Sequence, residues 1–104
     1  MGAIRGVLEE ELERLKELSM KYREMIASLP KGSISIKERR GHPYAYLAFR
    51  EKGKVRFEYL GKASSARVKE LEKEIESRRR YESLLRKVEK DRKEVERAIH
   101  GRKK

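Results

Sequence analysis

The spacing of apolar residues changes twice along this chain of 104 residues, and that change restricts its fold more than any other feature. In residues 4–29 and again in residues 64–100, apolar side chains recur every three or four positions, as on one face of an amphipathic helix. Between these segments, residues 33–60 alternate apolar and polar side chains, as half-buried strands do. The pattern predicts an α+β fold with two long helices on either side of a small sheet in the sequence.

The central segment divides into three short strands at two turns. Gly41 and Pro43 interrupt the alternation once, and Gly53, in the run EKGK, can take the positive φ angle that a tight hairpin requires. We therefore expect a three-stranded antiparallel sheet, and two antiparallel helices that form a hairpin like a coiled coil. The length fits a single domain over residues 1–104, with a basic tail at 101–104.

Alternation also predicts which side chains share a face of the sheet, and we expect the more apolar set to face the core. The inward set is Ile34, Ile36, Leu47, Phe49, Val55, Phe57 and Tyr59. The outward set is Ser33, Ser35, Lys37, Tyr44, Tyr46, Arg50, Arg56 and Glu58. Rings and cations would then share an outer surface, although two outward tyrosines could instead simply pair across strands.

Positive charge is concentrated in two blocks of the sequence. The net charge is +11, and nine Lys and Arg against three Glu give residues 30–62 a charge of +6. Residues 78–104 carry twelve Lys and Arg against five acidic residues, which gives a charge of +7. Phosphate backbones are the commonest partners of such surfaces. Abundant Lys, Arg and Glu without Cys or Trp also fits ion pairing in a protein from a thermophilic source.

These patterns favour a small basic protein that binds double-stranded DNA, because cations meet phosphates, rings stack on bases, and a small sheet can enter a major groove. The alternatives are a non-catalytic coiled-coil adaptor for a protein partner and, third, an RNA-binding protein. The candidate nucleic-acid-binding residues are Lys37, Arg39, Arg40, Tyr44, Tyr46, Arg50, Lys52, Lys54, Arg56, Arg78, Arg79 and Arg80.

The second predicted helix is longer than the first, so its C-terminal end would overhang and lack a partner within one chain. We therefore expect a homodimer with Val88, Val95 and Ile99 in its interface.

Residues that would carry catalysis or hold a metal are sparse. The chain has no Cys, and its two histidines, His42 and His100, are far apart in the sequence. We expect no enzyme activity, no metal and no cofactor. No apolar run reaches the roughly 20 residues of a membrane span, and acidic residues interrupt the basic second helix, so we expect a cytoplasmic protein without membrane binding.

Three short motifs carry a resemblance. The chain contains LPKGS at 29–33, YAYLAFREKGK at 44–54 and YLGK at 59–62, followed by a charged helix. This order resembles a group of small uncharacterised archaeal and bacterial proteins that share LPxGS, YxYLxxRExGK and YLGK. The strand segment is more loosely similar to the three-stranded arm-binding domains of tyrosine recombinases. That second resemblance implies that the sheet reads DNA, as in a regulator or accessory factor of a mobile element or host gene.

Overall fold

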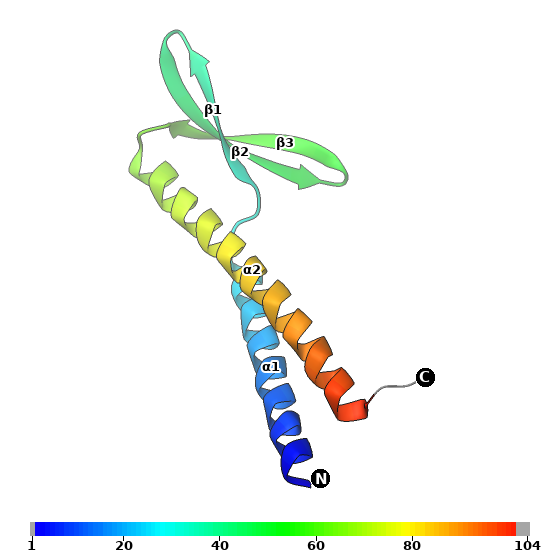
Figure 1. The fold of residues 1–104 in the computed structure, drawn as a ribbon. Helices are drawn as coiled ribbons and strands as arrows, with labels where there is room; N and C mark the ends of the chain where they lie inside the picture. The colour runs from blue at the N-terminus through cyan, green and yellow to red at the C-terminus, as the bar shows by residue number, and fades with distance from the viewer. Residues whose placement is uncertain (1, 102–104) are drawn as a thin grey trace. The chain divides into compact units, whose positions relative to one another are not determined.

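A computed structural model describes residues 2–101 and confirms the predicted α+β order of elements (Figure 1). The elements are α1 (Gly2–Ser28), β1 (Ser33–Arg39), β2 (His42–Glu51), β3 (Lys54–Lys62) and α2 (Ala66–His100). Beyond Gly101, the predicted basic tail lies outside the described residues. The chain forms two compact units, one with the residues up to Ser28 and from Arg80 on, the other with Leu29–Arg79.

The three strands form an antiparallel sheet in the order β1-β2-β3. Each connection is a two-residue turn with positive φ at both positions: 53° and 79° at Arg40 and Gly41, and 52° and 79° at Lys52 and Gly53. Positive φ at both central residues defines the type I′ turn, whose twist matches that of the flanking strands. The two turns lie at opposite ends of β2, as the splayed hairpins of Figure 1 show.

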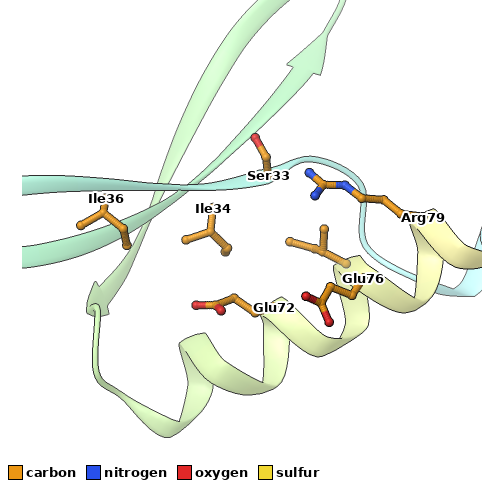
Figure 2. Close-up of a pocket in the computed structure, with 7 residues that line it drawn as sticks. Ser33, Ile34, Ile36, Glu72, Glu76 and Arg79 are labelled. Carbon is orange, nitrogen blue, oxygen red and sulfur yellow. The ribbon is translucent and has the colours of Figure 1, made fainter.

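One face of the sheet packs against the N-terminal half of α2. The core of this unit is Ala45, Leu60 and Val68, each no more than 7% exposed, with Ile34, Leu47 and Leu71 packed around it. Figure 2 shows Ile34 and Ile36 on the side of β1 that faces the helix. This packing leaves the opposite face of the sheet away from α2.

The start of α2 is fixed by a capping residue. Ser65 precedes the helix, and its hydroxyl accepts a hydrogen bond from the backbone N–H of Val68 at 3.3 Å. Side-chain oxygens at this position satisfy one of the free N–H groups of the first turn. The chain just before it is tied to the sheet, since the Ala63 N–H donates to the carbonyl of Pro43 at 3.1 Å.

In the other unit, α1 and the C-terminal part of α2 run antiparallel. The rings of Tyr22 and Tyr81 lie 5.8 Å apart, whereas Arg5, near the start of α1, donates to the carbonyl of Ile99 at 3.5 Å. Leu15 and Val88 are buried, at 2% and 7% exposure.

A polar group is also buried in this helix pair. Ser19 is 3% exposed, and its hydroxyl donates to Glu89 Oε2 at 2.7 Å while it accepts from Arg23 Nε at 3.3 Å. Arg23 and Arg92 lie within 3.8 Å of the Glu89 carboxylate. Each polar group in this cluster therefore has a partner, as burial requires.

The predicted C-terminal overhang of the second helix is wrong, because Arg5 of α1 reaches Ile99. Val88 is buried within one chain, and Val95 and Ile99 are half-buried. The extra length of α2 lies instead at its N-terminal end, where Val68 packs on the sheet. The homodimer stays a prediction, but the reason given for placing Val88 in its interface no longer applies.

Candidate nucleic-acid interface

Strand pairing determines which side chains share the sheet face that lies away from α2, because directly opposed residues point to the same side. Ser35 pairs with Tyr46, which pairs with Tyr59, and this row lies on that face. We call this surface the open face; its described members are Ser33, Ser35, Lys37, Arg39, His42, Tyr44, Tyr46, Ala48, Arg50, Val55, Phe57, Tyr59 and Lys62.

The outward positions predicted for β1 and β2 agree with this register, but the faces predicted for β3 are reversed. Val55, Phe57 and Tyr59 were expected in the core and are 53%, 51% and 55% exposed. Arg56 and Glu58 were expected on the outer face and instead share the helix side with Phe49 and Leu47, their cross-strand partners.

Burial of Leu60 explains why the faces of β3 are reversed. Its side chain is buried with Ala45 and Val68 on the helix side of the sheet. Because side chains alternate along a strand, Tyr59 and Phe57 then point to the open face. The pairing also shifts between Ala45 and Tyr46, where Leu60 has no direct partner and β3 contains a bulge.

The open face carries a continuous cluster of rings. Tyr59 lies 5.4 Å from Tyr46 in an edge-to-face arrangement and 6.2 Å from Tyr44, between ring centroids. These distances are within the range in which aromatic pairs attract. Tyr44 and Tyr46 are half-buried, whereas Phe57 and Tyr59 keep about half of their surface exposed.

An ammonium group lies inside this cluster. The Nζ atom of Lys37 is 4.1 Å from the centroid of Phe57 and 5.1 Å from that of Tyr46. Such contacts hold a cation against ring faces with an energy of about 0.5–1 kcal/mol at exposed sites. Arg50 and Lys62, both exposed, belong to the same face.

The structure places four of the predicted cations at the hairpin turns rather than among the rings. Arg39, the last residue of β1 and of the open face on that strand, and Arg40 lie at the turn between β1 and β2. Lys52 and Lys54 lie at the turn between β2 and β3, and all four are exposed. The ten residues of β2 separate the turns by about 33 Å, so these two pairs flank the open face at its ends.

Arg56 and the arginine run of α2 are not part of the open face. Arg56 Nε lies 3.0 Å from Glu51 Oε1, in an exposed ion pair on the other side of the sheet. Arg78 donates to the carbonyl of Leu29 at 2.8 Å, and Arg79 lines a hollow between the sheet and α2. Arg80 belongs to the unit of the helix pair.

Sequence reasoning therefore missed Phe57, Tyr59 and Lys62 as members of this surface. The sequence contains one indication of the true orientation of β3, the run YLGK. In this run Gly61 follows Leu60, which packs against Val68. Glycine within a strand often marks a bulge, after which side chains change face.

Two hollows lie between the sheet and α2. One, of about 320 Å³, is lined by Ser33, Ile34, Ile36, Glu72, Ile75, Glu76 and Arg79 (Figure 2). The other, of about 390 Å³, lies around Leu47, Leu60 and Leu71. Among the described residues, no group of three or more His, Asp or Glu side chains could hold a metal ion. Over those same residues, neither helix is long and apolar enough to cross a membrane.

Comparison with known proteins identifies a family to which part of the chain is similar. The model of a family described as a domain of unknown function, DUF6788, matches residues 4–73, which include the LPKGS, YAYLAFREKGK and YLGK segments. No curated protein and no solved structure matches the chain.

Proposed function

The chain belongs to the DUF6788 family, and we propose that this member binds nucleic acid through the open face of its sheet. The observation that carries this proposal is the position of Lys37, whose ammonium lies against Phe57 and Tyr46 on a face with exposed rings. Nucleic acids combine phosphate charge with flat bases, and a surface that interleaves cations and rings is complementary to both.

The surrounding charge supports the same partner. Lys37, Arg50 and Lys62 lie on the open face, and two further pairs of cations flank it at the turns. A protein that neutralises phosphates gains affinity through release of counterions, which makes binding depend on salt. The binding proposed here involves no catalysis.

The test compares two arginines of one hairpin. Arg50 lies on the open face, whereas Arg56 lies on the other face and pairs with Glu51. Each change to Ala removes one positive charge, so Arg56→Ala is the matched control. Affinity for labelled 20-nucleotide single strands and duplexes is measured by fluorescence anisotropy at several salt concentrations. We expect Arg50→Ala to weaken binding and reduce the log–log salt slope by about 0.7–0.9, the contribution of one phosphate contact.

We expect Arg56→Ala to leave the slope of the wild-type protein nearly unchanged. Equal effects of the two variants would mean that general positive charge, and not the open face, is responsible. Absence of measurable binding to every nucleic acid at low salt would rule out the proposed function.

A second candidate is the adaptor that binds a protein partner. Its support is the exposure of two neighbouring apolar side chains one turn apart on α1, Ile4 and Val7, which are 72% and 66% exposed. Exposed apolar patches mark interaction surfaces when they are contiguous. This candidate predicts that nucleic acid binds weakly and without sensitivity to Arg50.

A further inference from the structure

Building on the proposed function, we infer that the open face takes single strands, with unpaired bases stacked on Phe57 and Tyr59. Both rings lie on β3 and are 51% and 55% exposed. A ring can stack only on the flat face of a base. In a duplex these faces are covered by the neighbouring base pairs, and only base edges are accessible in the grooves. In a single strand the flat faces are free.

The composition of the chain also lacks the side chains that read adenine in a duplex. Side chains that recognise adenine in the major groove through two hydrogen bonds are Asn and Gln. The sequence contains no Asn, no Gln and no Thr. On the open face, the polar groups able to reach base edges are the serines, the tyrosine hydroxyls and the side chains of Lys37, Arg39, His42, Arg50 and Lys62. This surface therefore offers rings and charges, the two features that bind single strands with little sequence preference.

The ring contacts show how a base could be accommodated. Tyr59 lies 5.4 Å from Tyr46 and 6.2 Å from Tyr44 between ring centroids, and it remains 55% exposed. Lys37 lies 4.1 Å from the centroid of Phe57, so a base that stacks on this side of the ring displaces the ammonium. The displaced ammonium then lies beside the stacked nucleotide and can pair with its phosphate.

The partner chemistry is thus an unpaired base on a phosphodiester strand, which both DNA and RNA supply. The probes are labelled single strands of 20 thymidine or 20 uridine nucleotides and a 20-base-pair duplex of mixed sequence. We expect at least tenfold tighter binding to the single strands than to the duplex. Equal affinity for the thymidine and uridine strands identifies the shared chemistry, and a difference between them shows which strand is preferred.

Ring variants test the stacking directly. Phe57→Leu and Tyr59→Leu keep an apolar side chain at an exposed position but remove the ring. We expect each to weaken single-strand binding about tenfold, in the range that loss of one stacked base produces, with no change of salt slope because stacking releases no counterions. Tyr59→Phe keeps the ring without its hydroxyl and should retain wild-type affinity, which separates stacking from hydrogen bonding.

The outcomes separate this inference from the proposed function. Tighter duplex binding that is insensitive to both leucine variants would overturn the single-strand inference, while nucleic-acid binding itself would stand. No binding of strand or duplex would remove both. Thermal unfolding of each variant, followed by circular dichroism, shows that the fold is kept; because both side chains are exposed, we expect little change.

Discussion

Gly32 shows how one residue fixes the entry of the chain into its sheet. Its φ angle is 109°, a conformation that residues with a side chain rarely adopt. A Cβ atom there would overlap the carbonyl oxygen of Ala48 and lie 3.2 Å from Cδ1 of Leu47. The glycine of LPKGS therefore lets the start of β1 approach the middle of β2 closely.

Replacement of Gly32 should therefore destabilise the fold. We expect Gly32→Ala to lower the free energy of unfolding by about 2 kcal/mol or more, from backbone strain and the overlap with Ala48. Gly6 is the control, because it lies within α1 and an added Cβ would meet nothing within 4 Å. Gly6→Ala should raise stability by up to about 1 kcal/mol, since alanine favours helix. Urea unfolding measures both; an unchanged midpoint for Gly32→Ala would contradict the argument.

A single residue, Leu60, also decides how much of the candidate site could be predicted from the sequence. The sequence identified Lys37, Tyr44, Tyr46 and Arg50 correctly as one surface, since alternation within β1 and β2 is unbroken. Alternation says which residues of a strand share a face, but not which of the two faces is covered. In β3 the apolar residues Val55, Phe57 and Tyr59 outnumber Leu60, yet burial of Leu60 against Val68 decides the orientation. That contact is tertiary, so local pattern does not contain it.

At the scale of elements, the order and type of all five were predictable from period and turn residues. The predicted helix at 4–29 corresponds to Gly2–Ser28, and the one at 64–100 corresponds to Ala66–His100, capped by Ser65. Both hairpin turns occur where a glycine follows a positively charged residue, at Arg40–Gly41 and at Lys52–Gly53. The antiparallel direction of the helix pair was also predicted, but its register was not. The register of the helix pair depends on which residues contact each other across it, and the hydrogen bond from Ser19 to Glu89 is one such contact.

The contact between Ser19 and Glu89 should stabilise the helix pair. Ser19→Ala removes a buried hydroxyl that donates to a carboxylate at 2.7 Å. Hydrogen bonds to charged groups contribute about 1.5–3 kcal/mol to the free energy of unfolding. The higher helix propensity of alanine offsets a few tenths of a kcal/mol of this loss. We expect a net loss of about 1–2 kcal/mol in the free energy of unfolding.

A double-mutant cycle with Glu89→Ala isolates this pair, and its expected coupling is about 1 kcal/mol. The exposed Ser83 of α2 provides the control, since Ser83→Ala should be neutral or slightly stabilising. Additive effects of Ser19→Ala and Glu89→Ala would show that the hydrogen bond does not couple the helices.

For the whole molecule, the homodimer stays a prediction with a revised contact surface. A pair of helices buries one seam, here around Leu15 and Val88, and leaves Ile4 and Val7 about two-thirds or more exposed on α1. We expect a second copy to cover these two side chains, because burial of large apolar groups drives association of helical units. Val88 is excluded from this surface by its burial within one chain.

Sedimentation equilibrium at micromolar concentration measures this association. We expect the mass of a dimer for the wild-type protein and of a monomer for the double variant Ile4→Lys with Val7→Lys. Met20→Lys, which changes an exposed apolar residue elsewhere on the same helix, serves as the comparison. A monomer mass for the wild-type protein over the whole concentration range would refute the dimer.

The ring cluster of the open face also gives the protein a built-in optical reporter. The chain has no tryptophan, so its five tyrosines dominate the intrinsic emission. Tyr44, Tyr46 and Tyr59 belong to the cluster, whereas Tyr22 and Tyr81 pair with each other in the helical unit. In the binding mode proposed above, we expect a stacked base to quench the first three and to leave the other two as an internal reference. Titration with an unlabelled strand should therefore lower the tyrosine emission only in part, and the expected residual emission is that of Tyr22 and Tyr81.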